Sequence, residues 1–494
     1  MKSVPTSLIL ITVDCLRADH VGFLGYQRAT TPFLDSLAKE SFVFSTAIAA
    51  GMPTYYSLPA ILASRYPLAL GRDILGIAPN ESTLASVLKE YGFRTAAFAA
   101  ANPYISSRFG YDQGYDCFRD FLNSGKLDFQ MRASGPRLQV RINQALAGAC
   151  HSVAPLGKVY DELYFEYCHR IASPSCESLD SARRFPSADV IVDHAIAWLN
   201  QNSGAPFFLW LHLMDPHGPY YPKPEALAEI GSDPVSGEKA SYLNSFWSRH
   251  DVTTNRLRRK LDRVIGLYDA GIRWADTQIR HLTESLVDLN VWDRCALAIT
   301  ADHGEEFLEH GGRFHAPLKL TEELIRVPLL LRAPELSGAR QISSPFGLID
   351  LAPTLLDCLG FPTPASFRGR SCWEPIVKGE AWDRPVFTEC IHGCTNPFLM
   401  QKRVAPRILS VRKGHHKLIV DFSSCSLQLF DLKADPAELT PLNDEAAKPI
   451  RRELLEHAGK FLAVSQKSRD FESRLGSQLR ELRIEWAHPT ASPN

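Results

Sequence analysis

The sequence has little that would mark a membrane, nucleic-acid-binding or disulfide-rich protein. No stretch of about 18 apolar residues occurs, so no integral membrane segment is predicted. Lysine and arginine total 54 against 55 acidic residues, and a net charge of -1 excludes general attraction to nucleic acid or to an anionic surface. The 11 cysteines form no CxxC pair and no zinc-type spacing, which favours free thiols in a reducing compartment.

The amino terminus also has little that indicates a targeting segment. The first apolar run, Ser7–Val13, is too short for a signal peptide with a cleavage site, and Asp14 follows it at once. We therefore expect a cytoplasmic protein. Internal repeats and low-complexity tracts are absent, and 494 residues with 45% hydrophobic content are ample for a large core.

Short apolar runs predict strands that are buried on both faces of a sheet. They are Leu8–Val13, Thr95–Ala100, Phe207–Leu213, Ala296–Thr300 and Val327–Arg332. Amphipathic helical patterns lie between them, over Thr31–Glu40, Ser82–Tyr91, Ser187–Leu199, Arg259–Asp288 and Asp350–Leu359. Such alternation predicts an α/β fold with a mainly parallel sheet between helices.

Two regions depart from this alternation. Residues 123–184 read as an insertion that could cap the active-site face, and Lys223–Asn255 reads as a loop that shapes the pocket. After Pro375, short strands are predicted over Pro385–Thr388, Arg407–Arg412, His416–Val420 and Ser426–Phe430, then helices over Glu453–Leu462 and Phe471–Arg483. We expect a catalytic domain over residues 1–380 and a small C-terminal α+β subdomain, with an antiparallel sheet and a helical tail, over residues 381–494.

Acidic and imidazole side chains follow three of the predicted strands, at the edge where α/β sheets bind ligands. Asp14 follows the first, Asp215 and His217 follow the third, and Asp302 and His303 follow the fourth. Clustered carboxylates repel one another unless a cation lies between them. An Asp-Asp-His set suits Mn or Zn, whereas all-oxygen sets suit Ca or Mg. The sequence therefore predicts a divalent metal ion held by Asp14, Asp302 and His303.

The segment Met52–Pro59 is a candidate for the nucleophile. Ser57 is predicted to cap the helix that follows, since Pro59 then falls in its first turn. Thr54 reads from spacing alone as a turn residue, but its hydroxyl could also coordinate the metal and attack an ester. Gly304 is expected to supply a flexible turn by which Asp302 and His303 converge on one ion.

Together these segments resemble the sulfatase family of the alkaline phosphatase superfamily, nearly from end to end. The most specific stretches are ILITVDCLRADHVGFLGY (Ile9–Tyr26), HLMDPHGPY (His212–Tyr220) and TADHGEEFLEH (Thr300–His310). The resemblance implies an alkaline-phosphatase-like core, a small C-terminal sheet domain, and a hydrolase acting on a small-molecule, glycan or lipid ester of sulfate or phosphate.

The resemblance also implies roles for single residues. Those matching metal ligands are Asp14, Asp302 and His303. Those matching contacts to the ester group or its leaving oxygen are His217 and His315. Expected substrate-binding residues are Arg17, Lys319 and Asp215. In a variant with two metals, the second ion is held by Asp215, His217 and His315.

The chain departs from the family at the nucleophile. Sulfatases usually carry Cys or Ser in a C/S-x-P-x-R motif, which is converted to formylglycine. Thr54 occupies that position, while Tyr56 and Leu58 replace the Pro and Arg. No formylglycine can form from Thr54, and the set resembles that of superfamily phosphotransferases and phosphodiesterases, which use Mn or Zn and a phospho-threonine.

The reaction predicted from the sequence is hydrolysis of a sulfate or phosphate ester by a metal-activated Thr54, with one Mn, Ca or Zn ion. The family indicates a sulfate ester, whereas a threonine ester lacks the aldehyde exit of formylglycine and favours a phosphate ester. One alternative is a phosphoryl or phosphodiester transferase acting on a sugar or lipid acceptor. The other is a non-catalytic binding homologue.

Overall fold

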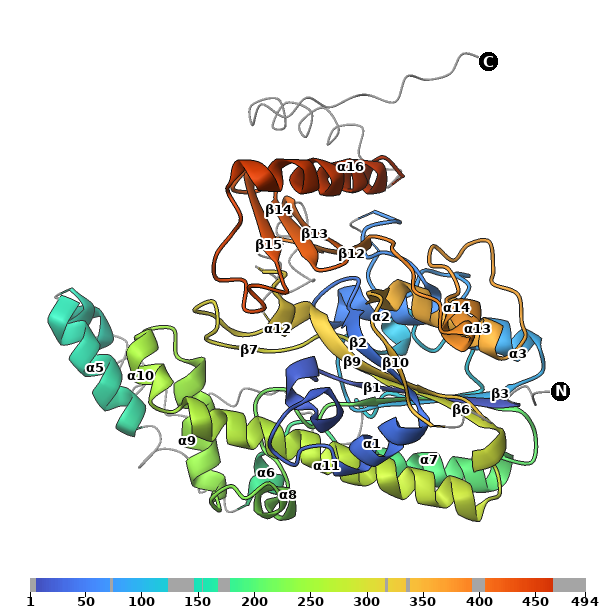
Figure 1. Ribbon diagram of the computed structural model, residues 1–494. Helices are drawn as coiled ribbons and strands as arrows, with labels where there is room; N and C mark the ends of the chain where they lie inside the picture. The colour runs from blue at the N-terminus through green and yellow to red at the C-terminus, as the bar shows by residue number, and fades with distance from the viewer. Residues whose placement is uncertain are drawn as a thin grey trace.

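The computed structural model describes residues 6–71, 74–122, 146–152, 154–167, 178–315, 319–334, 338–392 and 405–464. A nine-stranded sheet runs through the molecule between two layers of helices, and a four-stranded sheet lies beside it (Figure 1). Among the described residues, no helix is long and apolar enough to cross a membrane.

The large sheet has the strand order β10-β2-β9-β6-β1-β5-β3-β4, with β11 beside β2. Its strands are β1 (Ser7–Val13), β2 (Phe42–Ile48), β3 (Arg94–Ala99), β4 (Cys117–Arg119), β5 (Phe207–Leu213), β6 (Cys295–Thr300), β9 (Arg326–Arg332), β10 (Arg340–Ile342) and β11 (Phe346–Gly347). β1 lies at the centre, is buried along its whole length, and runs parallel to β5 and β6. The predicted α/β fold with a mainly parallel sheet is confirmed.

One strand runs against the expected direction. Val327–Arg332 was predicted as a parallel strand, but β9 is antiparallel to both neighbours, β2 and β6. The prediction is wrong because a strand buried on both faces reads as a continuous apolar run in either direction.

Helices cover both faces of the large sheet (Figure 1). One layer contains α1 (Pro32–Leu37), α7 (Ala188–Asn202) and α11 (Leu261–Asp288). The other contains α2 (Thr54–Ala63), α3 (Leu84–Glu90), α13 (Leu351–Cys358) and α14 (Trp373–Lys378). Short 3-10 helices lie at Ala18–His20, Gly22–Leu24, Ala38–Glu40, Ser107–Phe109, Trp292–Arg294, Leu348–Asp350 and Glu445–Ala447.

The region expected to be a loop over Lys223–Asn255 is helical instead. It contains α8 (Pro224–Glu229), α9 (Gly237–Ser248) and the start of α10 (Thr254–Arg258). Ser236 caps α9 by accepting a hydrogen bond from the backbone N–H of Lys239, and Pro224 opens α8, so the polar residues read as a loop are helix starts.

The insertion is described only in part. Its described elements are a helical segment at residues 146–151, α5 (Ala154–Tyr167) and α6 (Leu179–Ala182), whereas residues 123–145, 153 and 168–177 lie outside the described residues. Arg256 on α10 pairs with Glu162 on α5 at 2.7 Å, which ties α5 to the helices after Lys223. A cap over the active-site face stays a prediction.

The C-terminal strands form the predicted antiparallel sheet, in the order β12-β13-β14-β15. They are β12 (Val386–Ile391), β13 (Arg407–Lys413), β14 (His416–Asp421) and β15 (Ser426–Asp431), and α16 (Lys448–Val464) covers one face. The sheet contacts the segment before Thr54, since Thr388 Oγ1 donates to Ala49 O at 2.6 Å. The helix predicted over Phe471–Arg483 lies outside the described residues.

Candidate active site

Three strand ends meet at one edge of the large sheet. Thr12 on β1 pairs with His212 on β5 and with Thr300 on β6, so the residues that follow these strands lie together. This register brings Asp14 and the pair Asp302–His303 to the same place, as expected for the carboxyl ends of parallel strands.

The side chains of Asp14, Asp302 and His303 are completely buried, and their ligand atoms lie within 4.8 Å of one another. Asp302 Oδ1 accepts the backbone N–H of His303 at 3.0 Å, whereas its Oδ2 is buried without a hydrogen bond. His303 Nδ1 donates to Gly304 O at 2.9 Å, which leaves Nε2 as a lone-pair donor 3.5 Å from Asp302 Oδ2. Two buried carboxylates, one with an oxygen that makes no hydrogen bond, and an imidazole nitrogen fit a divalent cation.

Asp14 lies in a polar shell that favours its ionised form. Asn102 Nδ2 and His212 Nε2 lie 3.2 Å and 3.3 Å from Asp14 Oδ2. Burial acts to raise the pKa of Asp14, but His217, His212 and His303 together outweigh it and hold that pKa well below its usual value. Asp14 is therefore a carboxylate that can bind a cation.

Thr54 is the first residue of the buried helix α2. Its Oγ1 lies 3.2 Å from His303 Nε2 and 3.5 Å from Asp14 Oδ2. The amino end of α2 is thus directed at the acid cluster, and a helix amino end favours the negative charge of an ester anion.

The predicted role of Ser57 as a helix cap is wrong. The helix begins at Thr54, three residues earlier, and Pro59 lies in its interior. Ser57 instead donates from Oγ to the backbone carbonyl of Asp302 at 2.6 Å. The hydroxyl that was expected to cap the helix locally thus bonds a distant carbonyl instead, which connects α2 to the segment that carries the candidate metal ligands Asp302 and His303.

Gly304 is required for a different reason from the predicted flexible turn. Its φ lies outside the left-handed region, but a Cβ at this position would lie 2.0 Å from Glu323 O. The backbone at Gly304 therefore lies against the backbone at Glu323, and only glycine leaves room for that approach.

The two histidines matched to the ester group lie side by side, with ring centroids 5.0 Å apart. His217 Nδ1 donates to Gly218 O at 2.5 Å. His315 Nδ1 lies 3.1 Å from Glu305 Oε2, and Tyr220 donates to the other oxygen of Glu305 at 3.0 Å. Both Nδ1 atoms are therefore engaged, which leaves the Nε2 atoms for proton transfer.

Glu305 is completely buried and acts as a carboxylate partner of His315. Burial acts to raise the pKa of Glu305, but the charge and hydrogen bond of His315 outweigh it and lower that pKa. The carboxylate stays ionised and fixes the tautomer and the orientation of the imidazole.

The three residues expected to bind substrate are each held by protein groups. Arg17 donates to Asp19, Glu309 and the backbone of Glu305. Lys319 Nζ lies 2.7 Å from Glu306 Oε1, and Asp215 Oδ1 lies 3.3 Å from Arg183 Nη1. Asp215 has its pKa raised to about 6 by burial. A role in binding the ester anion stays a prediction for all three.

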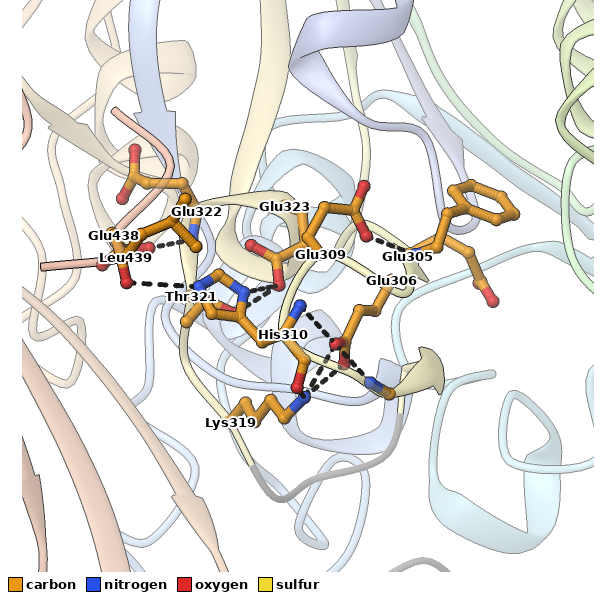
Figure 2. Close-up of polar contacts among 12 residues, drawn as sticks. Glu305, Glu306, Glu309, His310, Lys319, Thr321, Glu322, Glu323, Glu438 and Leu439 are labelled. Carbon is orange, nitrogen blue, oxygen red and sulfur yellow. Dashed lines mark hydrogen bonds and ion pairs between the residues drawn. The ribbon is translucent and has the colours of Figure 1, made fainter. Parts of the chain in front are cut away.

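A second acid–histidine group, Glu306, His310 and Glu323, lies nearby (Figure 2). Glu306 Oε1 accepts from Lys319 and from the backbone N–H groups of His310 and Gly312. His310 Nδ1 bonds Glu323 Oε1 at 2.8 Å. Because these oxygens already have protein partners, the group fits a structural network better than a metal site.

Several residues of the site were not predicted from the sequence. They are Asn102, His212, Glu305, Tyr220 and Cys15, whose Sγ lies 3.2 Å from Asp14 Oδ1. Asn102 had a usable signal, because it follows the predicted strand Thr95–Ala100 at the same sheet edge.

Comparisons with known proteins show the family of the chain. The Sulfatase family profile matches residues 6–361, and the profile described as N-sulphoglucosamine sulphohydrolase, C-terminal, matches residues 310–462. Arylsulfatase K of Rattus norvegicus is 28% identical over 285 residues, covering 51% of this chain and 48% of that protein. The chain thus spans about half the length of the arylsulfatase K proteins it matches. The multifunctional alkaline phosphatase superfamily protein PehA of Trinickia caryophylli is 22% identical over 481 residues, covering 89% of this chain and 92% of that protein.

Solved structures share the fold. The phosphonate monoester hydrolase of Agrobacterium radiobacter aligns with a TM-score of 0.64 and 18% identity over 93% of this chain and 95% of that one. A protein solved with its substrate D-glucosamine-2-N,6-O-disulfate aligns with a TM-score of 0.68 and 17% identity, over 94% and 99%. Because the Sulfatase profile covers well over half of the chain, the chain belongs to the sulfatase family of ester hydrolases, as the sequence predicted.

Proposed function

We propose that this chain hydrolyses esters of phosphate, phosphonate or sulfate with Thr54 as the nucleophile, and that phosphorus esters are its better substrates. The observation that carries the proposal is the position of Thr54 Oγ1, 3.2 Å from His303 Nε2 and 3.5 Å from Asp14 Oδ2. A hydroxyl at the start of a helix, beside a buried acid–histidine cluster, has the surroundings of an activated nucleophile.

The residues supply each part of a two-step displacement. Thr54 gives its hydroxyl proton to water as Oγ1 attacks the phosphorus or sulfur atom, and the bond to the alcohol oxygen breaks. A protonated Nε2 of His315 or His217 gives its proton to that leaving oxygen. Water then attacks the phosphorus or sulfur atom of the threonine ester and gives a proton to the histidine that was deprotonated in the first step. The Thr54 oxygen leaves and recovers a proton from water, and the product is phosphate, sulfate or an organic phosphonate.

The donor set also supports a metal cofactor. Asp14, Asp302 and His303 would hold one divalent ion, and Asp302 Oδ2, which is buried without a hydrogen bond, is the atom that lacks a partner in its absence. Such an ion would lower the pKa of the Thr54 hydroxyl and offset charge on the ester oxygens. The acid–imidazole set favours Mn or Zn over Ca.

The nucleophile decides between phosphorus and sulfur. Sulfatases that carry formylglycine release sulfate by re-forming the aldehyde, and a threonine side chain has no such exit. A threonine ester must instead be cleaved by water at the central atom, which has many parallels for phosphorus. Phosphate or phosphonate esters are therefore the substrates we expect to be turned over faster.

A substrate panel tests the proposal. We would assay p-nitrophenyl sulfate, phosphate, phosphodiester and phosphonate esters with Mn, Zn and Ca, using the wild type, Thr54→Ala and the control Thr277→Ala on α11. We expect Thr54→Ala to lose at least about a hundredfold in kcat, because the nucleophile is missing, and Thr277→Ala to match the wild type. Full turnover by Thr54→Ala would contradict the mechanism, and faster turnover of sulfate esters would overturn the preference for phosphorus.

A further inference from the structure

The contact between the C-terminal sheet and the catalytic segments contains a buried ion network. Lys417 on β14 is completely buried, and its Nζ lies 3.1 Å from Glu322 Oε1 and 2.9 Å from Glu438 Oε1. Arg412, the cross-strand neighbour of Lys417, lies 2.6 Å from Glu322 Oε2. Two acids and two bases therefore neutralise one another in a largely buried place, where an unpaired charge would be costly.

Electrostatics keeps Glu322 charged within this network. Burial acts to raise the pKa of Glu322, but the charges of Lys417 and Arg412 outweigh it and hold the pKa well below its usual value. The contact of Glu322 with Lys417 and Arg412 is thus an ionic one.

Glu322 is the first residue of the short helix α12 (Glu322–Ile325), which packs against the segment that follows the candidate ligands Asp302 and His303. Gly304 N donates to Leu324 O at 2.8 Å, and Glu305 N donates to Glu323 O at 3.1 Å. On its other side, α12 accepts the N–H of Ala49 at 2.8 Å, from the segment that leads to Thr54. The four-residue helix α12 therefore contacts both the backbone that follows His303 in the sequence and the backbone that precedes Thr54.

Glu438, which follows β15, adds further contacts to the same region (Figure 2). Its Oε2 accepts the backbone N–H of Glu322 at 2.6 Å. Its carbonyl lies 3.3 Å from Nε2 of His310, whose Nδ1 is bonded to Glu323. Glu438 thus makes two connections from the C-terminal subdomain: one to Glu322 of α12, and one to His310, which lies between Glu305 and His315 in the sequence.

We propose that Lys417 and Glu438 are positioning residues of the active site, acting through α12. They hold Glu322, α12 holds Gly304 and Glu305, and those two residues fix His303 and His315. A small misplacement of reacting groups lowers the rate steeply, whereas substrate binding depends less on it. Lys417 and Glu438 therefore connect the C-terminal subdomain to the active site, an inference that rests on the proposed function for the roles of His303 and His315.

The variant Lys417→Met tests this inference. We expect kcat to fall by about ten- to a hundredfold with KM within about twofold, because the catalytic geometry loosens while the pocket remains. Independently of any substrate, hydrogen exchange measured by mass spectrometry over residues 302–310 should become faster, since the Gly304 and Glu305 amides lose protection.

Two further variants make the result interpretable. Lys413→Met removes a half-buried lysine of the same sheet, paired with Glu453 at 2.6 Å, and should leave kcat and exchange unchanged. Lys417→Met with Glu438→Gln restores the charge balance, so it should fold even where the single variant does not, and we expect the same loss of kcat.

The outcomes separate this inference from the proposed function. If the folded double variant keeps wild-type kcat and wild-type exchange over residues 302–310, Lys417 and Glu438 do not position the site. If the wild type turns over no ester, the proposed function fails, while faster exchange in Lys417→Met would still show that the C-terminal sheet holds Gly304 and Glu305.

Discussion

Two buried charged clusters of this molecule differ in how their charge is balanced. In the ion network, Glu322 and Glu438 face Lys417 and Arg412, two acids against two bases. At the sheet edge, the carboxylates of Asp14 and Asp302 have only histidine, amide, hydroxyl, thiol and backbone contacts among the described residues, and Asp302 Oδ2 has no hydrogen bond. A balanced cluster holds structure, whereas an excess of buried negative charge marks a place for a cation and for chemistry.

The largest expected effect comes from removing a charge at the unbalanced cluster. Asp302→Asn keeps the shape of the side chain but removes a metal ligand. We expect metal affinity to fall by more than about a hundredfold, because loss of an outer-shell partner alone costs about ten- to a hundredfold. Metal content by mass spectrometry and isothermal titration with Mn and Zn would measure the change.

The buried Asp276 provides the matched control. Its carboxylate accepts the backbone N–H groups of Phe33 and Leu34, away from the catalytic edge. Asp276→Asn should leave metal affinity unchanged. Equal metal affinity in Asp302→Asn and the wild type would mean that Asp302 is not a ligand and that the charge argument fails.

The second-largest effect is expected from a change at Gly304, which contacts α12 and so lies between the ion network and the cluster at the sheet edge. Gly304→Ala would place a methyl group 2.0 Å from Glu323 O, so the backbone behind His303 must separate from α12. Overpacking of this kind costs about 1–3 kcal/mol of folding free energy, and we also expect loss of metal affinity. Urea unfolding and titration with metal would show both effects.

Gly204→Ala is the control for this change, since a Cβ there has nothing within 4 Å. Its free energy of unfolding should stay within about 0.5 kcal/mol of the wild type. A Gly304→Ala protein as stable as Gly204→Ala would show that α12 can move away at little cost, which would weaken the link between the clusters.

A smaller effect is expected at Glu305, where the acid faces a histidine instead of a lysine. Glu305→Gln keeps a hydrogen-bonding side chain but removes the charge that orients His315. We expect kcat to fall by about tenfold, at the low end of general acid catalysis, with KM nearly unchanged. Glu309→Gln removes the charge of an acid that lies four residues after Glu305 and contacts Arg17, and it should change kcat less. Equal losses would assign the effect to charge and not to orientation.

Much of the catalytic cluster was predictable because it follows from strand ends. The apolar runs before Asp14 and Asp302 gave the strands, and parallel neighbours must finish at one edge. Asn102 also follows a strand, but asparagine is common in turns, and its uncharged amide does not by itself indicate a metal or catalytic site. The direction of β9 was not predictable, because complete burial removes the alternation that would reveal it.

The ion network was beyond the reach of sequence patterns. Glu322 meets Lys417 only because the C-terminal sheet docks on the large domain, and a buried lysine in a short strand looks like any solvent-facing one. Similarly, Ser57 had the signature of a helix cap, and only the tertiary structure supplies the carbonyl of Asp302 as its acceptor. Local rules identify the residues that could act, and docking decides which partner each one takes.

The smallest expected effect concerns the pH dependence of folding stability and involves His310, which is half-buried at the edge of the ion network. The hydrogen bond with Glu323 raises the pKa of His310 from 6.5 to about 9. A raised pKa in the folded state gives stability that is complete below about pH 6.5 and is lost as the pH rises through 9. After allowance for solvent screening, we expect wild-type protein to lose about 1 kcal/mol more than His310→Gln between these two pH values. Urea unfolding at both pH values would test this. Parallel losses in the two proteins would mean that the pair is too exposed to contribute, and that the stabilising charge pairs of this interface are the buried ones at Lys417.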